Sequence, residues 1–295
     1  ERQPMRAKSL IITLFGDVIS QHGGEIWLGS IAKSVDALGV NDRLVRTSVF
    51  RLAKEGWLEV EREGRKSFYG FTRSGGKEYQ RAAQRIYSAG GDSWRGGWQL
   101  LMPTHLPEHL RDDFRRSLTW LGFRPISNGT FARPGGDEES IRDLLDEFDL
   151  SSGVVVMEAK TTALTTSKEW RAIVSEQWQL SHLEEDYRQL IGLFRPLKKA
   201  LDKGQLATPV EAFQARLLLI HEYRRILLRD TPLPNDLLPN RWQGTVARQL
   251  AQALYRDLAA PSTHYIQTEL VNRQGRLPES EHYFYERFGG IAKAL

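Results

Sequence analysis

The chain has 295 residues, 40% of them hydrophobic and 26% charged, with a net charge of +4; this composition is typical of globular proteins with two or three domains and excludes disordered and collagen-like chains. There is no cysteine, which excludes disulfides, thiolate zinc sites and cysteine nucleophiles, and no apolar stretch approaches the roughly 18 residues that a membrane span requires. We therefore expect a soluble, cytoplasmic protein with no membrane partner.

The first 90 residues carry the positive charge of the chain. They contain 15 Lys and Arg against 10 Asp and Glu, a balance of +5, whereas residues 91–295 contain 26 against 27, a balance of −1. A local excess of cations favours a polyanionic partner, because neutralising phosphates releases counterions. The N-terminal part is therefore the expected surface for such a partner.

The beginning of this part predicts three helices and one short strand. An apolar stripe with helical spacing runs through Leu10–Ile19, and Glu25–Leu28 follows as a strand. Ser30 can cap a second helix that stops at Gly39, and Asn41 can cap a third helix almost at once. Two helices joined by a very short glycine-containing turn are typical of the helix-turn-helix, whose second helix enters the DNA major groove.

The third predicted helix has an apolar side and a basic side. When residues 42–55 are wound as a helix, Val45, Val49 and Leu52 fall together. Side chains that bond to guanine edges and phosphates fall on or beside the opposite side of this helix. Phe50 also projects from the basic side, where it either touches a thymine methyl or packs on a neighbouring element. The DNA-binding residues predicted on this helix are Asn41, Arg43, Arg46, Thr47, Arg51 and Lys54.

A β-hairpin with a basic tip is predicted next. Apolar and polar residues alternate along Trp57–Arg62, which predicts a strand. Glu63–Lys66 is the predicted turn, and Ser67–Phe71 is the predicted returning strand. Helix, strand, helix, turn, helix and hairpin is the order of a winged helix, whose wing meets backbone phosphates or the minor groove. The wing residues predicted to contact DNA are Arg62, Arg65 and Lys66. The alternative is a solvated charged helix followed by an exposed basic turn.

Several N-terminal segments together carry a family resemblance. They are Ser9–Asp17, Gly23-Gly24, Trp27–Gly29, Arg43–Leu52 and Gly56–Leu58. In these segments the chain closely resembles the PaaX family of bacterial transcriptional repressors, which control operons for phenylacetic acid degradation. The resemblance implies a repressor that an acyl-CoA effector such as phenylacetyl-CoA releases from its operator.

A second unit is predicted after the paired glycines Gly90-Gly91 and Gly96-Gly97. Its pattern is β-α-β-β-α-β, the order of a ferredoxin-like fold. It begins with a strand at Trp98–Met102, has a hairpin turn at Asn128-Gly129 and ends with a buried strand at Val154–Met157.

The resemblance to the PaaX family extends through this unit, whose middle resembles the Cas2 nuclease fold. Cas2-like nucleases hold a metal with an Asp at the end of the first strand, where this chain has Leu101–Thr104 and no carboxylate. We therefore expect a dimerisation or packing module, with a nucleic-acid-processing enzyme built on the Cas2-like middle as the alternative.

From residue 167 onward the pattern is helical. A capping box at Thr208–Glu211 begins a long helix whose apolar stripe contains Arg224. A guanidinium in that position has two interpretations. It is a structural group, which forms an ion pair or reaches water at the end of its aliphatic stem, or it is part of a site that binds an anion. The family resemblance favours an acyl-CoA site, whose predicted residues are His221, Arg224, Arg225 and Trp242.

No catalytic, cofactor or metal motif is complete. The sequence His221-Glu222-x-x-Arg225 lacks the second histidine of a zinc protease, and no nucleophile stands at a recognisable spacing for a CoA-thioester enzyme, a further alternative.

We thus predict an α+β chain with three consecutive domains and no enzymatic activity. They are a winged-helix domain with a linker helix (1–92), a ferredoxin-like, Cas2-like α/β sandwich (93–165) and an all-helical effector and dimerisation domain (166–295). The predicted function is a repressor of a phenylacetate catabolic operon, acting as a homodimer on double-stranded DNA. Dimerisation is expected because one recognition helix reads too few base pairs for genomic specificity.

Overall fold

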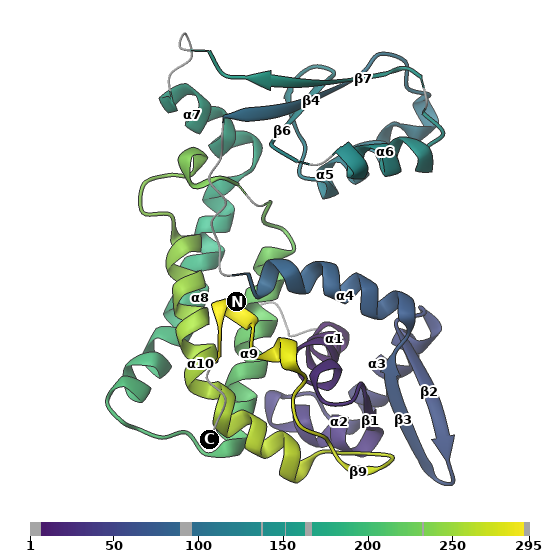
Figure 1. Ribbon diagram of the computed structural model, residues 1–295, viewed down its shortest axis with the longest axis vertical. Coiled ribbons are helices and arrows are strands. Elements are labelled where there is room, and N and C mark those ends of the chain that lie inside the picture. Colours follow the sequence, from purple (N-terminus) through teal and green to yellow (C-terminus); the bar gives the residue numbers. More distant parts are fainter. Residues whose placement is uncertain are drawn as a thin grey trace. The chain divides into compact units, whose positions relative to one another are not determined.

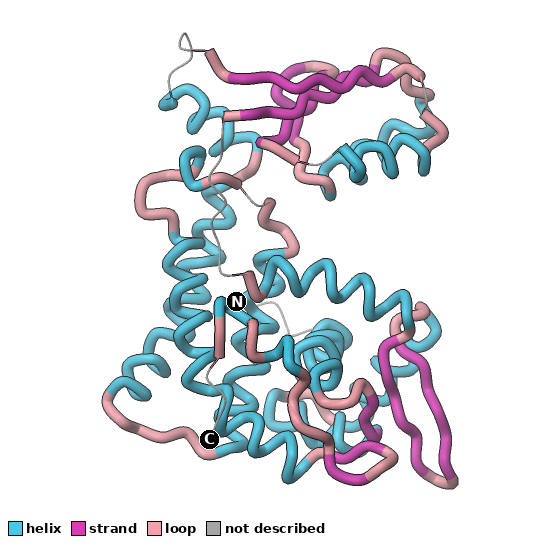
Figure 2. Tube along the Cα trace, in the orientation of Figure 1, coloured by secondary structure: helices cyan, strands magenta, loops and turns pink. Residues whose placement is uncertain are grey.

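The computed structural model describes residues 7–88, 96–136, 138–150, 152–162, 167–231 and 233–291. As far as these residues show, the chain combines helices with antiparallel sheets (Figures 1 and 2). Its packing separates into two compact units. The first contains Glu1–Ala89, Tyr187–Arg229 and Thr245–Leu295, and the second contains Gly90–Asp186 and Asp230–Gly244.

The N-terminal part of the first unit has the predicted order of helices and strands. Its elements are α1 (Ala7–Asp17), the 3₁₀ turn η1 (Ile19–Gln21), β1 (Glu25–Trp27), α2 (Leu28–Val35), the 3₁₀ turn η2 (Asp36–Leu38), α3 (Asp42–Lys54), β2 (Leu58–Glu63), β3 (Lys66–Phe71) and α4 (Arg73–Ile86). The strands form an antiparallel sheet in the order β1-β3-β2. One predicted detail is wrong: α2 begins at Leu28, so Ser30 lies inside the helix, where its hydroxyl accepts a hydrogen bond from the Val271 amide at 3.1 Å instead of capping.

The C-terminal part of the first unit contains long helices and one small hairpin. Its elements are α8 (Leu180–Asp202), whose first turns belong to the second unit, α9 (Pro209–Leu227), α10 (Gln243–Glu269), β8 (Val271–Asn272), β9 (Gly275–Arg276) and the 3₁₀ turns η5 (His282–Phe284) and η6 (Arg287–Gly289). The capping box of Thr208 and Glu211 at the start of α9 is confirmed.

The prediction of an all-helical C-terminal segment is wrong at the β8–β9 hairpin. The Asn272 side chain accepts a hydrogen bond from the Gln274 amide at 2.9 Å, which bends the chain, and Gly275 has a positive φ of 123°. Asparagine and glycine favour such a turn, because asparagine bonds to its own local backbone and glycine has no Cβ to clash.

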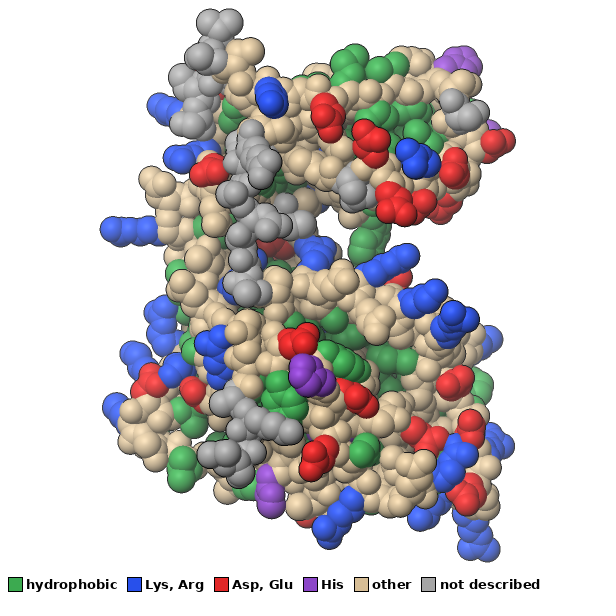
Figure 3. Space-filling view, viewed as in Figure 1, with side chains coloured by type: hydrophobic (Ala, Val, Ile, Leu, Met, Phe, Trp, Pro, Cys, Tyr) green, Lys and Arg blue, Asp and Glu red, His purple; other side chains and the backbone are tan. Residues whose placement is uncertain are grey.

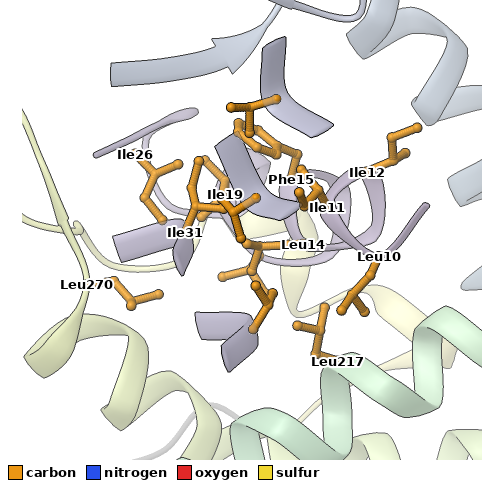
Figure 4. Packing of buried hydrophobic residues seen from close by; sticks show 14 of the residues in the cluster. Leu10, Ile11, Ile12, Leu14, Phe15, Ile19, Ile26, Ile31, Leu217 and Leu270 are labelled. Atoms are coloured by element: carbon orange, nitrogen blue, oxygen red, sulfur yellow. The ribbon is translucent and has the colours of Figure 1, made fainter. Parts of the chain in front are cut away.

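The main core of the first unit is built around α1, whose residues from Leu10 to Asp17 are all buried. A helix with apolar residues on every side must be covered all round. The C-terminal helices complete this cover: Phe213 and Leu217 of α9 and Ile266 of α10 belong to the same buried cluster, and Leu217 points toward α1 in Figure 4.

This cover explains why the packing differs from the three consecutive segments predicted from the sequence. The helices α9 and α10 belong to the same unit as the N-terminal elements, although more than a hundred residues of chain separate them from α4. Periodicity shows that a helix has an apolar face, but it does not show which partner covers that face.

The second unit contains the predicted β-α-β-β-α-β order. Its elements are β4 (Gly97–Pro103), the 3₁₀ turn η3 (Glu108–Leu110), α5 (Arg111–Trp120), β5 (Arg124–Ser127), β6 (Thr130–Pro134), α6 (Glu138–Glu147), β7 (Val154–Lys160), α7 (Ser167–Gln177) and the 3₁₀ turn η4 (Asn235–Leu237). All strand pairs are antiparallel, in the order β5-β6-β4-β7. The helices α5 and α6 contribute Phe114, Leu118, Ile141 and Leu144 to its core.

The predicted burial of β7 is wrong. This strand lies at the edge of its sheet, paired with β4, and Val155, Val156 and Met157 are 39%, 38% and 47% exposed. An uninterrupted apolar run is typical of a strand covered on both faces, but the same run also occurs in an edge strand, and periodicity alone does not separate the two.

Candidate nucleic-acid interface

The helix α3 is fixed by a cap at its start and an apolar face along its length. The Asn41 side chain accepts a hydrogen bond from the Leu44 amide at 3.0 Å, which confirms the predicted N-cap. Val45, Val49 and Leu52 are at most 1% exposed and belong to the core around α1. These contacts determine which side of the helix faces outward.

The outward side of α3 carries the predicted basic residues. All of the side chains predicted there are exposed: Asn41, Arg43, Arg46, Thr47, Arg51 and Lys54. Phe50 is 69% exposed and Leu44 46% exposed on the same helix, so Phe50 does not pack into the described core. The helix therefore presents cations and two apolar side chains together, which suits a surface that reads base edges and thymine methyl groups.

One cation of α3 already has an acidic neighbour. The Arg46 Nε donates to Asp42 at 2.6 Å, and this hydrogen bond raises the pKa of Arg46. Both side chains are more than half exposed, so the ion pair is weak and open to exchange with another anion.

The β2–β3 hairpin forms the second part of this surface. Its register pairs Glu63 with Lys66 across a tight turn, in which Gly64 has a positive φ of 57°. The predicted wing residues Arg62, Arg65 and Lys66 are exposed, and the Lys66 Nζ lies 5.5 Å from the centre of the Trp27 ring. Acidic side chains alternate with these cations, and Figure 3 shows blue and red side chains mixed at the lower right, over this hairpin.

Sequence reasoning missed a contact between this sheet and the C-terminal hairpin. Arg273, in the β8–β9 turn, forms ion pairs with Glu25 of β1, at 2.6 Å, and with Glu61 of β2. Its guanidinium also lies 5.6 Å from the centre of the Phe68 ring. No local signal points to this contact, because Glu25 and Arg273 are 248 positions apart in the chain.

The first unit also contains a group of buried ionic and phenolic side chains, here called the Asp17 cluster: Asp17, Tyr87, Arg216, Tyr255 and Arg287. Arg216 Nε donates to Asp17 Oδ2 at 3.1 Å, Arg287 donates to Oδ1 at 2.9 Å, and both tyrosine hydroxyls donate to Oδ1 at 2.7 Å. The five side chains come from α1, the end of α4, α9, α10 and the C-terminal segment, so the cluster connects the N- and C-terminal parts of the first unit.

The Asp17 cluster holds its carboxyl group ionised. Burial alone would raise the pKa of Asp17, but Arg216, Arg287 and the two tyrosine hydroxyls outweigh it and hold the pKa below its usual value. One carboxylate therefore faces two guanidiniums inside the protein, which leaves an excess of positive charge there. Arg216 lies close to the apolar stripe of α9, so the same helical winding that singled out Arg224 could have found it.

The predicted effector residues are not all brought together. His221 and Arg224 lie on the buried side of α9, where His221 Nδ1 is 3.3 Å from Thr13 Oγ1 and burial lowers the pKa of His221 to about 4. Arg225 is exposed and donates to Glu222 at 3.0 Å, and Trp242 belongs to the second unit. The assignment of these four residues to an effector stays a prediction.

Arg224 has an unusual environment. It is 7% exposed, its guanidinium lies 5.8 Å from the centre of the Tyr79 ring, and within the described residues its Nε has no hydrogen-bond partner. Burial lowers its pKa. The Nε of this guanidinium has therefore exchanged water for an aromatic face, which compensates its desolvation only in part.

Among the residues that the structure describes, no three His, Cys, Asp or Glu side chains lie close enough to hold a metal ion, and no helix is long and apolar enough to cross a membrane.

The chain matches three family descriptions in succession. Residues 6–75 match "PaaX-like protein", residues 91–171 match "PaaX protein central Cas2-like domain", and residues 178–268 match "PaaX-like protein C-terminal domain". The chain is also similar to a curated protein named transcriptional repressor PaaX from Escherichia coli strain K12, with 38% identity over 292 residues, which cover 98% of this chain and 92% of the relative.

A solved structure shares the fold. It is that of the uncharacterized protein Rv0674 from Mycobacterium tuberculosis, with a TM-score of 0.55 and 20% identity over 86% of this chain and 98% of that one. At this identity the likeness concerns the fold alone.

Proposed function

Because the chain belongs to the PaaX family of transcriptional repressors, we propose that α3 is the recognition helix and β2–β3 the wing of a winged helix-turn-helix that binds an operator. The observation that carries this proposal is the outward basic side of α3, which is held in place by its buried apolar side. Arginine side chains on such a helix reach the acceptor pair of guanine in the major groove.

The two parts of the surface have different tasks. On α3, Arg43 and Arg46 reach base edges, and Arg46 exchanges its bond to Asp42 for one to DNA. On the wing, Arg62, Arg65 and Lys66 bind phosphates, which positions the helix without reading sequence. Because acidic residues alternate with the wing cations, we expect their contribution to affinity to be modest.

We further propose that two copies of the chain bind one operator in the cytoplasm. A twofold dimer places two recognition helices on two half-sites, which doubles the length of sequence that is read. The regulated genes are those of phenylacetate breakdown, and an acyl-CoA effector such as phenylacetyl-CoA releases the repressor. Such an effector acts only through its different affinities for the DNA-binding and the released form. In this proposal the chain regulates and does not catalyse.

A binding experiment tests the assignment of α3 and the wing. Fluorescence anisotropy is measured on a promoter fragment of a phenylacetate catabolic operon and on fragments with single base changes, at several salt concentrations. Arg43→Ala or Arg46→Ala should cost about 1–3 kcal/mol on the preferred sequence and reduce discrimination between fragments. Lys66→Ala should weaken binding to all fragments equally and lower the salt slope by about 1.

The matched control is Arg142→Ala, which removes an exposed arginine from α6 in the second unit. This variant should bind like the unchanged protein. Losses of the same size on every fragment for Arg43→Ala, Arg46→Ala and Lys66→Ala would contradict the assignment of base reading to α3.

A further inference from the structure

A cavity of about 770 Å³ lies within the first unit. Its walls come from the end of α1 and the turn after it, from the end of β3 and α4, and from the C-terminal segment around Arg287. This volume is within the range of sites that hold small molecules. None of the residues predicted as effector contacts from the sequence lines it.

One side of the cavity is suited to a flat apolar group. Four aromatic residues line it: Phe71, Tyr79, Tyr87 and Tyr283. The Phe71 and Tyr79 rings stack with their centres 5.8 Å apart, and behind Tyr79 lies the poorly compensated guanidinium of Arg224. Aromatic walls of this kind favour an aromatic ligand, because rings pack against each other face to edge or offset.

The polar residues of the lining favour a ligand with hydrogen-bond donors and negative charge. Gln21 lines the cavity and is 3% exposed, and its Oε1 is buried without a hydrogen-bond partner among the described residues. Water does not reach this oxygen in the present conformation, so a ligand N–H or O–H would pair with it only after the Gln21 side chain turns toward the cavity. Arg287 of the Asp17 cluster also lines the cavity, and Arg73 and Lys77 add exposed cations. Of the described residues in the lining, Glu286 alone is acidic.

We propose that this cavity binds an aromatic acyl thioester of coenzyme A, which combines an aromatic ring, amide N–H donors and phosphates in one molecule. The ring lies beside Phe71, Tyr79 and Tyr87, and the phosphates lie outside, near Arg73 and Lys77. An amide of the thiol arm donates to Gln21 once that side chain has turned toward the cavity. The identity of the ligand rests on the proposed function, whereas the cavity and its lining do not. Arg224 acts here as a positioning residue behind the Tyr79 ring.

The start of α4, which lines the cavity, is hydrogen-bonded to the residues that follow the proposed recognition helix α3. Thr72, which lines the cavity and caps α4, donates from its hydroxyl to the carbonyl of Gly56 at 2.5 Å, and its amide donates to the carbonyl of Trp57 at 3.0 Å. Gly56 and Trp57 lie two and three residues after the end of α3. A ligand that displaces the first turn of α4 therefore moves the end of α3, which supplies a route from effector to DNA.

The test measures ligand binding to the whole chain by calorimetry in the absence of DNA, with phenylacetyl-CoA, coenzyme A and phenylacetate as separate probes. Phenylacetyl-CoA should bind at least tenfold more tightly than either fragment. Ala83→Trp and Gln84→Trp, which fill the cavity from α4, should each weaken binding at least tenfold, and Lys77→Glu should weaken phenylacetyl-CoA and coenzyme A but not phenylacetate. Gln84 is exposed, so its variant stays informative if Ala83→Trp fails to fold.

The matched control is Lys203→Glu, an exposed charge reversal after α8 that does not line the cavity, and it should bind like the unchanged protein. Unchanged affinity in both tryptophan variants overturns the location of the site, while the proposed function stands. Binding of the promoter fragment without binding of any probe overturns the ligand. Binding of phenylacetyl-CoA in the cavity by a chain that does not bind the promoter leaves the site intact and overturns the proposed function.

Discussion

Replacing Asp17 by asparagine should lower the free energy of unfolding by about 3–5 kcal/mol, the usual cost of removing one partner from a buried ion pair. Asparagine has nearly the same shape, so packing is kept and the change removes mainly charge. Arg216 and Arg287 are 0% and 6% exposed and would then lie in the interior without a counter-ion. The Tyr87 and Tyr255 hydroxyls would also lose a charged acceptor at 2.7 Å.

The loss is measured by urea unfolding at pH 7, followed by circular dichroism, as a lower midpoint at unchanged slope. The matched control is Asp42→Asn, which breaks the ion pair with Arg46 on the surface of α3. Both of those side chains are more than half exposed, so less than about 1 kcal/mol should be lost. If Asp17→Asn costs no more than Asp42→Asn, the Asp17 cluster does not stabilise the first unit.

Three further predictions concern acid stability, base reading and release. His22 and His221 are buried, and burial lowers the pKa of each from 6.5 to about 4, so only the unfolded chain takes up their protons as the pH falls below 6.5. The free energy of unfolding should therefore fall between pH 6.5 and 4, by about 3 kcal/mol for each histidine. His221→Gln should make this pH dependence weaker in unfolding curves taken at several pH values. Phe50→Ala should weaken binding to the promoter fragment in anisotropy titrations without lowering the thermal midpoint, because its side chain is 69% exposed; a lower midpoint with unchanged affinity would assign it to packing. Arg224→Ala should leave promoter affinity intact and require at least tenfold more phenylacetyl-CoA for release, and release at the original concentration would make Arg224 purely structural.

The sequence was sufficient where the decisive interactions are local. The two sides of α3 follow from 3.6-residue periodicity, and its start follows from Asn41, whose capping bond spans three positions. The outward position of Arg43 was predictable for the same reason. The burial of β7 was not, because an apolar run such as Val154–Met157 does not reveal whether a sheet continues beyond it.

The candidate cavity and the Asp17 cluster, which share Tyr87 and Arg287, could not be predicted from the sequence because their side chains come from distant parts of the chain. Asp17 meets Arg216 and Arg287 across 199 and 270 positions, and single-sequence patterns contain no information on such pairings. Arg224 was singled out by its place in the apolar stripe of α9, but its neighbour Tyr79 comes from α4, so its surroundings could not be predicted.

The burial of α1 from Leu10 to Asp17 has a consequence for how the protein is made. This helix leaves the ribosome before the residues of α10 that help to cover it, such as Ile266, which are translated about 250 residues later. At ordinary rates of synthesis, roughly 5–20 residues per second, that interval is on the order of 10 to 50 s. During this time the nascent α1 exposes apolar surface, so it depends on chaperones or on provisional contacts until α9 and α10 have been made.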